Sequence, residues 1–459
     1  MTGYFIEAQI DRMRRDYPIG EDFSKLVGML SRDELRNVQE KRLAEVMECA
    51  WQVPFYQRRW GAAGIEPGDI RSLDDIEKIP PFSKADLMAS IEDNPPLGDY
   101  HGMKSMGDDE RPSVVFHTTS GTTGTPQPLF FGAWDREVQN LLLARAYRLQ
   151  GMNDEDVVHS VYGFGMVNGG HYIREAVLHF TKALLLPAGT GLETPSAQQV
   201  QLIKHFRVTV LAGFVDYIKR LAEVAREEGI DPADLKVRMI SGQIGQDDRD
   251  AVSAMWGGAA VYDWYGVGDT GIIASEGPDQ NGLHIFEDAH YLELLDPVTH
   301  VPVAAGDPGN ICVTVLFKTT VYPIVRFDTK DVTTQLTGPS DLGLGLRRVA
   351  GFQGRSDNMV KLRGVNIYPT AIGAHLAEHP AAHGEYVCRV ENEGHRKTMT
   401  VLVEVIESAI GDDQVTQVLA ALLRQKLGVG VDVKTVGPGE TAALTQIESR
   451  QKPIRLLSL

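Results

Sequence analysis

Between Val157 and Tyr262 the chain alternates short apolar runs with segments of helical periodicity. The apolar runs, which we expect to be strands, are Val157–Val161, Lys182–Leu186, Thr209–Ala212, Val237–Ile240 and Ala260–Tyr262. The segment Val215–Glu228, between two of these runs, has the apolar spacing of an amphipathic helix. Strands that alternate with helices usually pair in parallel and carry the helices on their faces. The pattern therefore predicts an α/β fold built on parallel-rich sheets with flanking helices.

The segments on either side of this core have other patterns of apolar and polar residues. The first hundred residues are polar and helical, as in Arg32–Gln52. Short alternating runs predict a small antiparallel, barrel-like subdomain, and they lie at Tyr291–Leu295, Asn310–Val315, Thr320–Val325 and Val332–Gln335. Beyond the glycine-flanked stretch Val349–Arg355 we expect an α+β arrangement, with strands Glu385–Val390 and Thr398–Val405 and helices Ala371–His379 and Asp413–Leu427. This predicts a large N-terminal domain, residues 1–353, and a small mobile C-terminal domain, residues 354–459.

Charge and cysteine content exclude several classes of protein. The 459 residues carry a formal net charge of −17, which disfavours nucleic acid as a partner. Three cysteines lie far apart without a C-x-x-C motif, which favours a reducing compartment and argues against a cysteine metal site. No signal peptide or membrane-spanning apolar run is evident, so we expect a cytoplasmic protein with no membrane association.

A loop rich in hydroxyls and glycines, Thr118–Pro126, follows the apolar run Val114–Phe116. Glycine lets main-chain N–H groups approach a phosphate, and Ser and Thr hydroxyls can donate to phosphate oxygens or reach Mg²⁺. A solvated linker is the alternative, but linkers rarely lie between two strand-like apolar runs. The loop differs from the common P-loop, because Gly121 and Gly124 are too close together and Thr125 follows where a lysine is needed. The sequence therefore predicts a polyphosphate site that is neither a kinase nor a GTPase site.

Four further motifs follow the loop in a fixed order. They are Tyr265–Thr270 preceded by Ser241–Gln243, Arg326–Asp331, Gly354–Pro369, and Gln451–Arg455 near the C-terminus. Together with the loop they resemble the acyl-adenylate-forming superfamily of acyl-CoA synthetases, adenylation domains and luciferases. Within it the chain is most similar to the phenylacetate–CoA ligases, particularly in Asn281–Asp288 and Arg363–Pro369.

The resemblance implies an AMP-forming acid–thiol ligase. ATP would convert an aromatic carboxylic acid into an acyl-AMP, and the thiol of coenzyme A would then displace AMP. The implied small molecules are ATP, Mg²⁺, coenzyme A and an aryl or arylacetic acid, and a homodimer is possible. Transfer to an amine or a carrier protein stays open. So does a non-catalytic nucleotide-binding homologue, because Thr125, Gln243, Asp269 and Gln451 depart from residues usual in the family.

The resemblance also assigns residues to ATP. The phosphates would be held by Thr119, Ser120, Gly121, Thr122, Thr123 and Gly124, with Thr122 also catalytic. Asp269 would be the catalytic Mg²⁺ ligand, since it keeps the hard oxygen donors of the usual glutamate; a turn or cap residue is the alternative. Tyr265 and Gly266 would contact adenine, whose edge would be lined by Ser241, Gly242 and Gln243.

The C-terminal motifs supply the remaining roles. Asp331 would accept from the ribose hydroxyls with support from Arg326, and Arg355 would contact ribose or phosphate. Asp357 matches the family's hinge, and Lys452 matches the catalytic lysine that bridges ATP and the acid; Lys361 or Arg450 could be misread as that lysine, and a solvated terminal lysine is the alternative. A lysine on a long stem suits a charge delivered by a moving domain.

The acid pocket is expected after the strands. Its candidate residues are Tyr162, Phe164, His171, Gly213 and Phe214, whose rings and glycines favour a flat acid over a long chain, or else form ordinary core. His117 would contact the substrate or cap the loop. Some relatives bind zinc near the segment that contains His284, but Ala274–Gln280 has no cysteine, so no structural zinc is expected.

Overall fold

The computed structural model describes residues 3–107, 111–119, 126–245, 248–363, 365–393, 396–445 and 453–458. These residues form two compact units. The first contains residues 1–244, 249–329 and 333–351, and the second contains residues 245–248, 330–332 and 352–459. Both units combine helices and strands, which confirms the predicted α/β fold class.

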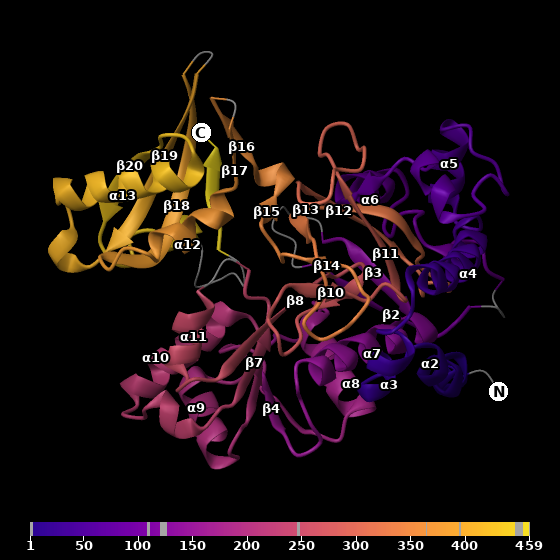
Figure 1. Cartoon of the computed structure of the whole chain (residues 1–459), viewed down its shortest axis with the longest axis horizontal. Coiled ribbons are helices and arrows are strands. Elements are labelled where there is room, and N and C mark those ends of the chain that lie inside the picture. The colour runs from indigo at the N-terminus through magenta and orange to yellow at the C-terminus, as the bar shows by residue number, and fades with distance from the viewer. Residues whose placement is uncertain are drawn as a thin grey trace. The chain divides into compact units, whose positions relative to one another are not determined.

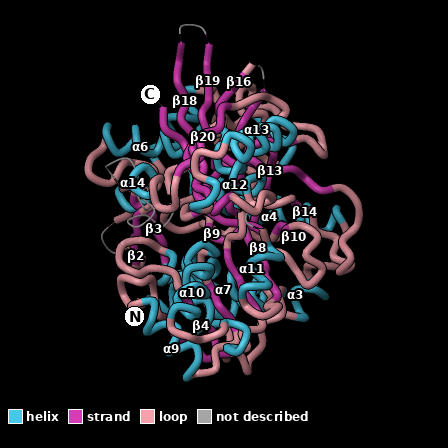
Figure 2. Tube along the Cα trace, turned by 90° about the vertical axis from the view of Figure 1, so that its left-hand side faces the viewer, coloured by secondary structure: helices cyan, strands magenta, loops and turns pink. Residues whose placement is uncertain are grey.

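Five parallel strands form one half of the large sheet in the first unit. Their spatial order is β5-β4-β6-β7-β8, with β4 Val157–Ser160, β5 Leu184–Pro187, β6 Val210–Ala212, β7 Met239–Gly242 and β8 Ala260–Val267. The helices between successive strands are α8 Gly169–Phe180, α9 Ser196–His205, α10 Val215–Glu227 and α11 Arg249–Met255. Helices α9 and α10 lie side by side in both views (Figures 1 and 2). The predicted strands and the amphipathic helix are therefore confirmed.

The core between these helices and the sheet explains the pairing of strands and helices. Leu211, Ile240 and Val261 from the strands pack with Ile218 and Leu221 of α10, all of them buried. The apolar face of α10 meets the strands, while its charged residues face away, as expected for an amphipathic helix. Burial of this continuous apolar surface is the main favourable term that holds the parallel half together.

The antiparallel strands continue the same sheet. They run in the order β9-β10-β14-β13-β12-β11, with bounds β9 Gly271–Ser275, β10 Leu283–Ile285, β11 His290–Leu295, β12 Pro308–Val315, β13 Ile324–Leu336 and β14 Arg348–Val349. The antiparallel β8–β9 pair joins the two halves, so hydrogen bonding is continuous where the sequence suggested a separate sheet or barrel. The strand expected at Thr320–Val325 is present only from Ile324 onward. That strand, β13, continues without a break through Val332–Gln335, because its charged middle residues find partners and do not form a turn.

The remaining elements of the first unit lie N-terminal to the parallel half. They are α1 Tyr4–Glu7, α2 Ile10–Asp16, α3 Glu21–Leu26, α4 Arg32–Ala50, α5 Pro54–Ala62, β1 Phe82–Ser83, α6 Lys84–Asp93, β2 Val114–Thr118, β3 Pro128–Gly132 and α7 Ala133–Leu149. Ser31 and Glu34 form a capping box that fixes the start of α4. Helix α7 is buried along nearly its whole length and directly follows the β2–β3 hairpin. In β2 only His117 is buried, and Thr118 and Thr119 at the start of the Ser/Thr/Gly loop are half-buried.

The second unit is a small α+β structure. Its sheet has the order β20-β19-β18-β21, with β18 Ala382–Glu393, β19 Arg396–Val405, β20 Asp432–Val436 and β21 Leu456–Ser458. The other elements are β15 Gly354–Arg355, β16 Val360–Leu362, β17 Val365–Ile367, α12 Ile372–Leu376, α13 Asp413–Leu427 and α14 Ala442–Thr445. Asp412 caps α13, and Gly428 ends it in the left-handed conformation that favours glycine.

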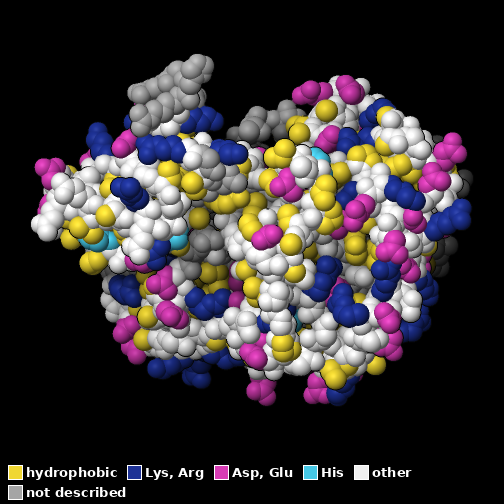
Figure 3. All heavy atoms as spheres, turned by 45° about the horizontal axis from the view of Figure 1, so that its top comes forward, with side chains coloured by type: hydrophobic (Ala, Val, Ile, Leu, Met, Phe, Trp, Pro, Cys, Tyr) yellow, Lys and Arg dark blue, Asp and Glu magenta, His cyan; other side chains and the backbone are white. Residues whose placement is uncertain are grey.

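Surface charge and hydropathy agree with the composition. On the face shown in Figure 3, basic and acidic side chains are interspersed and form no continuous basic stripe. Within the described ranges, no helix has both the length and the apolar character needed to cross a bilayer.

Candidate active site

The carboxyl ends of four neighbouring parallel strands meet at one edge of the sheet. Tyr162 follows β4, Gly213 follows β6, and Gly242 and Gly266 lie at the ends of β7 and β8. In open α/β sheets this edge is where ligands bind, because the connecting loops diverge there and leave a crevice. Residues predicted separately for the acid and for adenine are thus placed along one edge.

Aromatic rings line the acid side of this edge. The Tyr162 ring lies edge-on to Phe214 with centroids 4.8 Å apart, and Phe164 lies edge-on to His171 at 5.2 Å. Trp264, which the sequence analysis did not assign, is 6.3 Å from Tyr162. The Tyr162 hydroxyl and the Trp264 indole N–H are buried and have no hydrogen-bond partner among the described residues. Four of the predicted pocket residues therefore contact one another in two pairs, and the tyrosine and the indole add two buried polar groups.

His117 joins this aromatic group from β2. Its ring centroid is 5.0 Å from that of His171. Burial, together with the nearby Arg136 charge and His171, lowers the pKa of His117 to about 4, so the imidazole is neutral at pH 7. His171 Nε2 lies 3.0 Å from the Gly165 carbonyl oxygen, which fixes its ring beside Phe164. Two imidazoles thus lie side by side, one next to Phe164 and the other on β2, just before the predicted phosphate loop.

Glycine is required at the strand ends because another main chain passes too close for a side chain. A Cβ atom on Gly242 would lie 1.8 Å from the Gly213 carbonyl oxygen, and one on Gly266 would lie 2.3 Å from the Gly271 oxygen. The β8–β9 register shifts between Tyr265 and Gly266, which is the irregularity often found beside active sites. These glycines set the spacing of the strand ends on which the site residues stand.

Hydrogen bonds hold the start of the predicted phosphate loop. The Thr118 N–H donates to the Met166 carbonyl at 2.8 Å, and the Thr119 N–H donates to the Gln127 carbonyl at 3.1 Å. Lys84, at the start of α6, donates from Nζ to Thr119 Oγ1 at 3.3 Å. Sequence reasoning missed Lys84, which brings a cation to the start of the predicted loop. The other predicted loop residues lie outside the described residues, namely Ser120, Gly121, Thr122, Thr123 and Gly124.

Asp269 is buried at the turn after β8, where two side chains fix its carboxylate. Gln127 Nε2 donates to Asp269 Oδ1 at 2.6 Å, and the Tyr322 hydroxyl donates to the same oxygen at 2.8 Å. Mg²⁺ usually keeps several waters and takes one or two carboxylates together with substrate phosphates. The described residues contain no group of three or more His, Cys, Asp or Glu side chains that could hold an ion alone. A single buried carboxylate therefore fits a Mg²⁺ ion that is held jointly with ATP.

A buried cation accompanies this carboxylate. Lys318 is fully buried, and its Nζ has no hydrogen-bond partner among the described residues. Burial lowers the pKa of Lys318 to about 8 against the opposing charges of Asp135 and Asp269, so the amine is mostly protonated at neutral pH. Neither Lys318 nor Tyr322 could be assigned from a motif, because both come from the turn between β12 and β13.

The predicted adenine residues have internal partners. The Tyr265 ring is 5% exposed, and its hydroxyl donates to Thr329 Oγ1 at 3.3 Å. The Ser241 hydroxyl donates to Gln150 Oε1 at 2.6 Å and is buried, so this hydroxyl serves the interior. Gln243 Nε2 donates to the Gly266 carbonyl at 3.2 Å and connects the ends of β7 and β8.

Arg326, expected to support the ribose site, directs its guanidinium to other partners in this structure. It is buried and forms a two-pronged ion pair with Glu293, with Nη2–Oε1 at 2.7 Å and Nε–Oε2 at 3.0 Å. A further guanidinium nitrogen donates to the carbonyl oxygens of Ile79 and Glu77. The guanidinium is therefore occupied in joining the N-terminal segment to the sheet.

In the second unit, Arg355 lies between two predicted site carboxylates. Its Nη1 is 2.8 Å from Asp331 Oδ1, and its Nη2 is 2.6 Å from Asp357 Oδ2. The Asp331–Arg355 pair follows from the antiparallel pairing of β13 with β15. Lys452 lies outside the described residues, as does the alternative Arg450.

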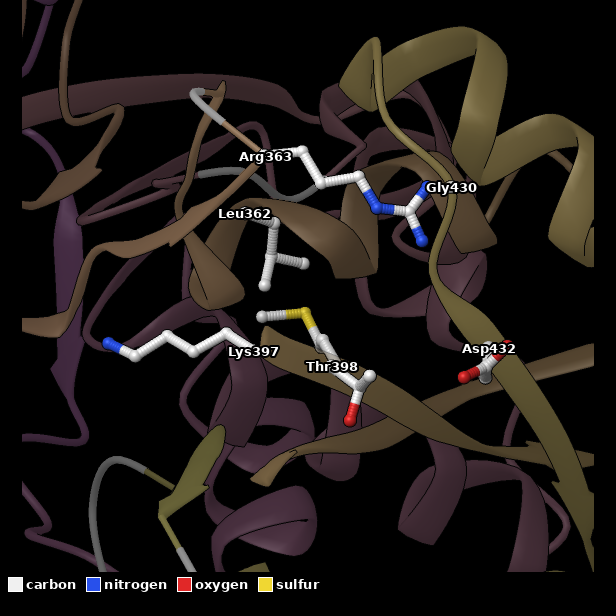
Figure 4. A pocket seen from close by; sticks show the side chains of 7 residues that line it. Leu362, Arg363, Lys397, Thr398, Gly430 and Asp432 are labelled. Carbon is white, nitrogen blue, oxygen red and sulfur yellow. The ribbon is translucent and has the colours of Figure 1, made fainter. Parts of the chain in front are cut away.

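Two other features of the described chain involve none of the residues predicted for ATP or the acid. A pocket of the second unit, lined by Arg363, Lys397 and Asp432 among others (Figure 4), holds about 30 Å³, far below the roughly 300–1,000 Å³ typical of small-molecule sites. His284 Nε2, on β10, lies 2.7 Å from Oγ of Ser340 in the connection between β13 and β14. The absence of a structural zinc at His284 stays a prediction.

Comparison with known proteins places the chain among adenylate-forming enzymes. A family model described as AMP-binding enzyme matches residues 70–316, and one described as AMP-binding enzyme C-terminal domain matches residues 364–454. The phenylacetate–coenzyme A ligase of Aromatoleum evansii is 31% identical over 384 residues, covering 82% of each chain. That of Escherichia coli (strain K12) is 29% identical over 426 residues, covering 89% of this chain and 92% of its own.

The fold agrees with a solved relative over nearly the whole chain. A 2-hydroxyisobutyryl-CoA ligase in the postadenylation state matches with a TM-score of 0.82 at 26% identity, covering 94% of this chain and 91% of its own. The family models span both units, and their order along the chain is that of the motifs. The chain therefore belongs to the AMP-binding enzyme family.

Proposed function

We propose that this chain is an ATP-dependent acid–coenzyme A ligase that activates an aromatic, aryl or arylacetic, carboxylic acid. The observation that carries the proposal is the meeting of four strand ends, from β4, β6, β7 and β8, where the ring-lined acid residues adjoin the predicted adenine residues and Asp269. The relatives named phenylacetate–coenzyme A ligase and 2-hydroxyisobutyryl-CoA ligase support thioester formation with CoA as the acceptor.

The reaction has two steps, formation of the acyl-AMP and transfer of the acyl group to CoA. A carboxylate oxygen attacks the α-phosphorus of ATP, the bond to the bridging oxygen breaks, and pyrophosphate leaves with acyl-AMP remaining. The sulfur of CoA then attacks the acyl carbon, its proton is lost, and AMP leaves. The first step places anionic oxygens against one another, so it needs positive charge and exclusion of water.

We assign the phosphate end to residues on both sides of the loop. Lys84 would donate to the phosphates beside Thr119, with Ser120, Gly121, Thr122, Thr123 and Gly124 completing the cradle. Asp269 would hold Mg²⁺, which when bound neutralises phosphate charge. Lys452 would place a mobile cation between ATP and the acid.

The other predicted residues would bind the adenine and ribose of ATP. Tyr265 and the strand ends at Gly242, Gln243 and Gly266 would flank adenine. Asp331 would accept from the ribose hydroxyls, and Arg355, which already pairs with Asp331, would hold that carboxylate in place. Asp357 would serve as the hinge between half-reactions.

The acid would lie among Tyr162, Phe164, His171 and Phe214. Their edge-on contacts form a rigid apolar wall that favours a planar ring. The buried Tyr162 hydroxyl and Trp264 N–H offer partners for a polar ring substituent, since buried polar groups normally find a partner. A cytoplasmic location and a homodimer are further parts of the proposal.

The test is release of pyrophosphate with Mg·ATP across benzoates, phenylacetates and heteroaromatic acids, each with and without CoA. Three results together support the ligase. Pyrophosphate release depends on one class of acid, it falls in Asp269→Asn and Lys452→Ala, and a thioester forms when CoA is present. Acyl-AMP without a thioester would move the acceptor to an amine or a carrier protein. ATP binding without release for any acid would count against the proposal and favour a non-catalytic homologue.

A further inference from the structure

Lys318 stands out because its fully buried amine has no hydrogen-bond partner within the described part of the chain. Its Nζ makes no hydrogen bond to a described residue, yet the charges of Asp135 and Asp269 act on it. Burial of an ammonium group is costly unless nearby groups compensate its charge. The position of this amine therefore calls for a reason beyond packing.

The turn that carries Lys318 is held in place on its other side. Asp135 Oδ1 accepts from the Thr319 N–H at 3.2 Å, and Oδ2 accepts from the Thr320 hydroxyl at 2.5 Å. The Trp134 indole N–H donates to the Phe317 carbonyl at 3.0 Å. Helix α7 thus anchors the turn that carries the side chains of Lys318 and Tyr322.

The Lys318 amine, the Tyr322 ring and the Asp269 carboxylate lie in sequence. Its Nζ lies 4.4 Å from the centroid of the Tyr322 ring and 4.9 Å from that of Phe131. The Tyr322 hydroxyl donates to Asp269 Oδ1. A cation over the ring face draws electron density from the ring, which makes the hydroxyl a stronger donor, and bonds to a charged acceptor are already stronger than neutral ones.

We propose that Lys318 and Tyr322 form a positioning pair for Asp269, in which the cation strengthens the tyrosine hydroxyl bond that fixes the carboxylate for Mg·ATP. Gln127 donates to the same oxygen and completes the support. The inference rests on the proposed function, in which Asp269 holds Mg²⁺. Both residues are positioning residues, since they act through Asp269.

The experiment measures how much Mg²⁺ improves ATP binding, as the ratio of the calorimetric affinities with Mg²⁺ and with EDTA. The variants are Tyr322→Phe, Lys318→Met and the double variant. Tyr100→Phe is the matched control, because its buried ring lies 5.2 Å from Tyr322 but its hydroxyl donates to the Pro128 carbonyl. Tyr322→Phe removes one oxygen and keeps the packing, so its affinity ratio can be measured even where Lys318→Met does not fold.

We expect Tyr322→Phe to lower the Mg²⁺-dependent ratio about tenfold and to leave binding in EDTA unchanged. Lys318→Met should lower it less, and the double variant should match Tyr322→Phe alone, because the lysine acts through the tyrosine. An unchanged ratio in Tyr322→Phe, an equal loss with EDTA, or effects that multiply in the double variant would overturn the proposal.

Asp269→Asn separates this inference from the proposed function. Where Asp269→Asn removes the Mg²⁺-dependent gain but Tyr322→Phe keeps it, the positioning pair alone is wrong. Where Asp269→Asn keeps the improvement of ATP binding by Mg²⁺, Asp269 is not the metal ligand, and the proposed positioning pair is wrong as well. Calorimetry needs no acid, so the outcome does not depend on finding the substrate.

Discussion

Replacement of Gly242 by alanine tests whether strand spacing sets the geometry of the site. The added methyl group would lie 1.8 Å from the Gly213 carbonyl oxygen, whereas real Cβ atoms essentially never approach below 3.0 Å. The main chain must therefore separate by about 1.2 Å at this point. Gly213 has little room to yield, because its N–H donates to the Ser241 carbonyl at 3.1 Å.

The shift has two measurable consequences. Overpacking of a tight interior costs roughly 1–3 kcal/mol of unfolding free energy, which urea denaturation followed by circular dichroism would measure. A misplacement of about 1 Å at a reacting centre can lower a rate roughly 100-fold. We therefore expect acid-dependent exchange of pyrophosphate into ATP to fall by about that factor, since Gly213 borders the acid residues and Gly242 the adenine residues.

Gly61→Ala is the matched control. Gly61 lies in α5 with no heavy atom within 4 Å of its added Cβ, so the same substitution should leave exchange unchanged. It should also stabilise the helix by roughly 0.5–1 kcal/mol. The reasoning fails if Gly242→Ala matches the wild type in both assays. A loss of stability with normal exchange would show that the strain is absorbed away from the site.

Three further predictions concern individual side chains. Lys84→Met should raise the KM for ATP about fivefold with little change in kcat, because it removes one charged donor beside Thr119; steady-state exchange kinetics would show this. Arg326→Met should lower the unfolding free energy by roughly 3–5 kcal/mol, because it leaves Glu293 buried and unpaired; urea titration would measure this. An unchanged KM for ATP in the same variant would exclude a ribose role for Arg326. Burial raises the pKa of Asp263 to about 7. The folded state therefore keeps the Asp263 proton at pH values where the unfolded chain has lost it. The free energy of unfolding consequently falls as the pH rises from about 4 through 7. Thermal melts from pH 5 to 8 should therefore decline less steeply in Asp263→Asn, and parallel curves would contradict the assignment.

The elements that the sequence predicted correctly are those whose pattern is local. Leu211 and Ile240 lie in short apolar runs that need only the period of a strand, and α10 repeats its apolar positions at helical spacing. Strand β13 was divided wrongly because Asp328 and Asp331 interrupt its apolar pattern. Asp328 is satisfied by Asn310 and Asp331 by Arg355, and neither partner is adjacent in the sequence.

The same distinction explains what was missed at the candidate site. The motifs identified Asp269 and Thr119, because family-specific spacing surrounds them. The groups that hold these residues lie far away in the sequence, with Lys84 separated from Thr119 by 35 positions and Gln127 from Asp269 by 142. Such partners carry no motif of their own, so only the fold reveals them.

The charge of the chain illustrates how local these effects are. A net charge of −17 opposes an anionic nucleotide, yet exposed charges more than about 10 Å apart are largely screened at 0.1 M salt. Lys84 reaches the start of the phosphate loop, and the buried Lys318 acts through a low-dielectric interior where screening is weak. The affinity for Mg·ATP should therefore depend on these nearby cations, and moderate salt should weaken the contribution of the exposed Lys84 more than that of Lys318.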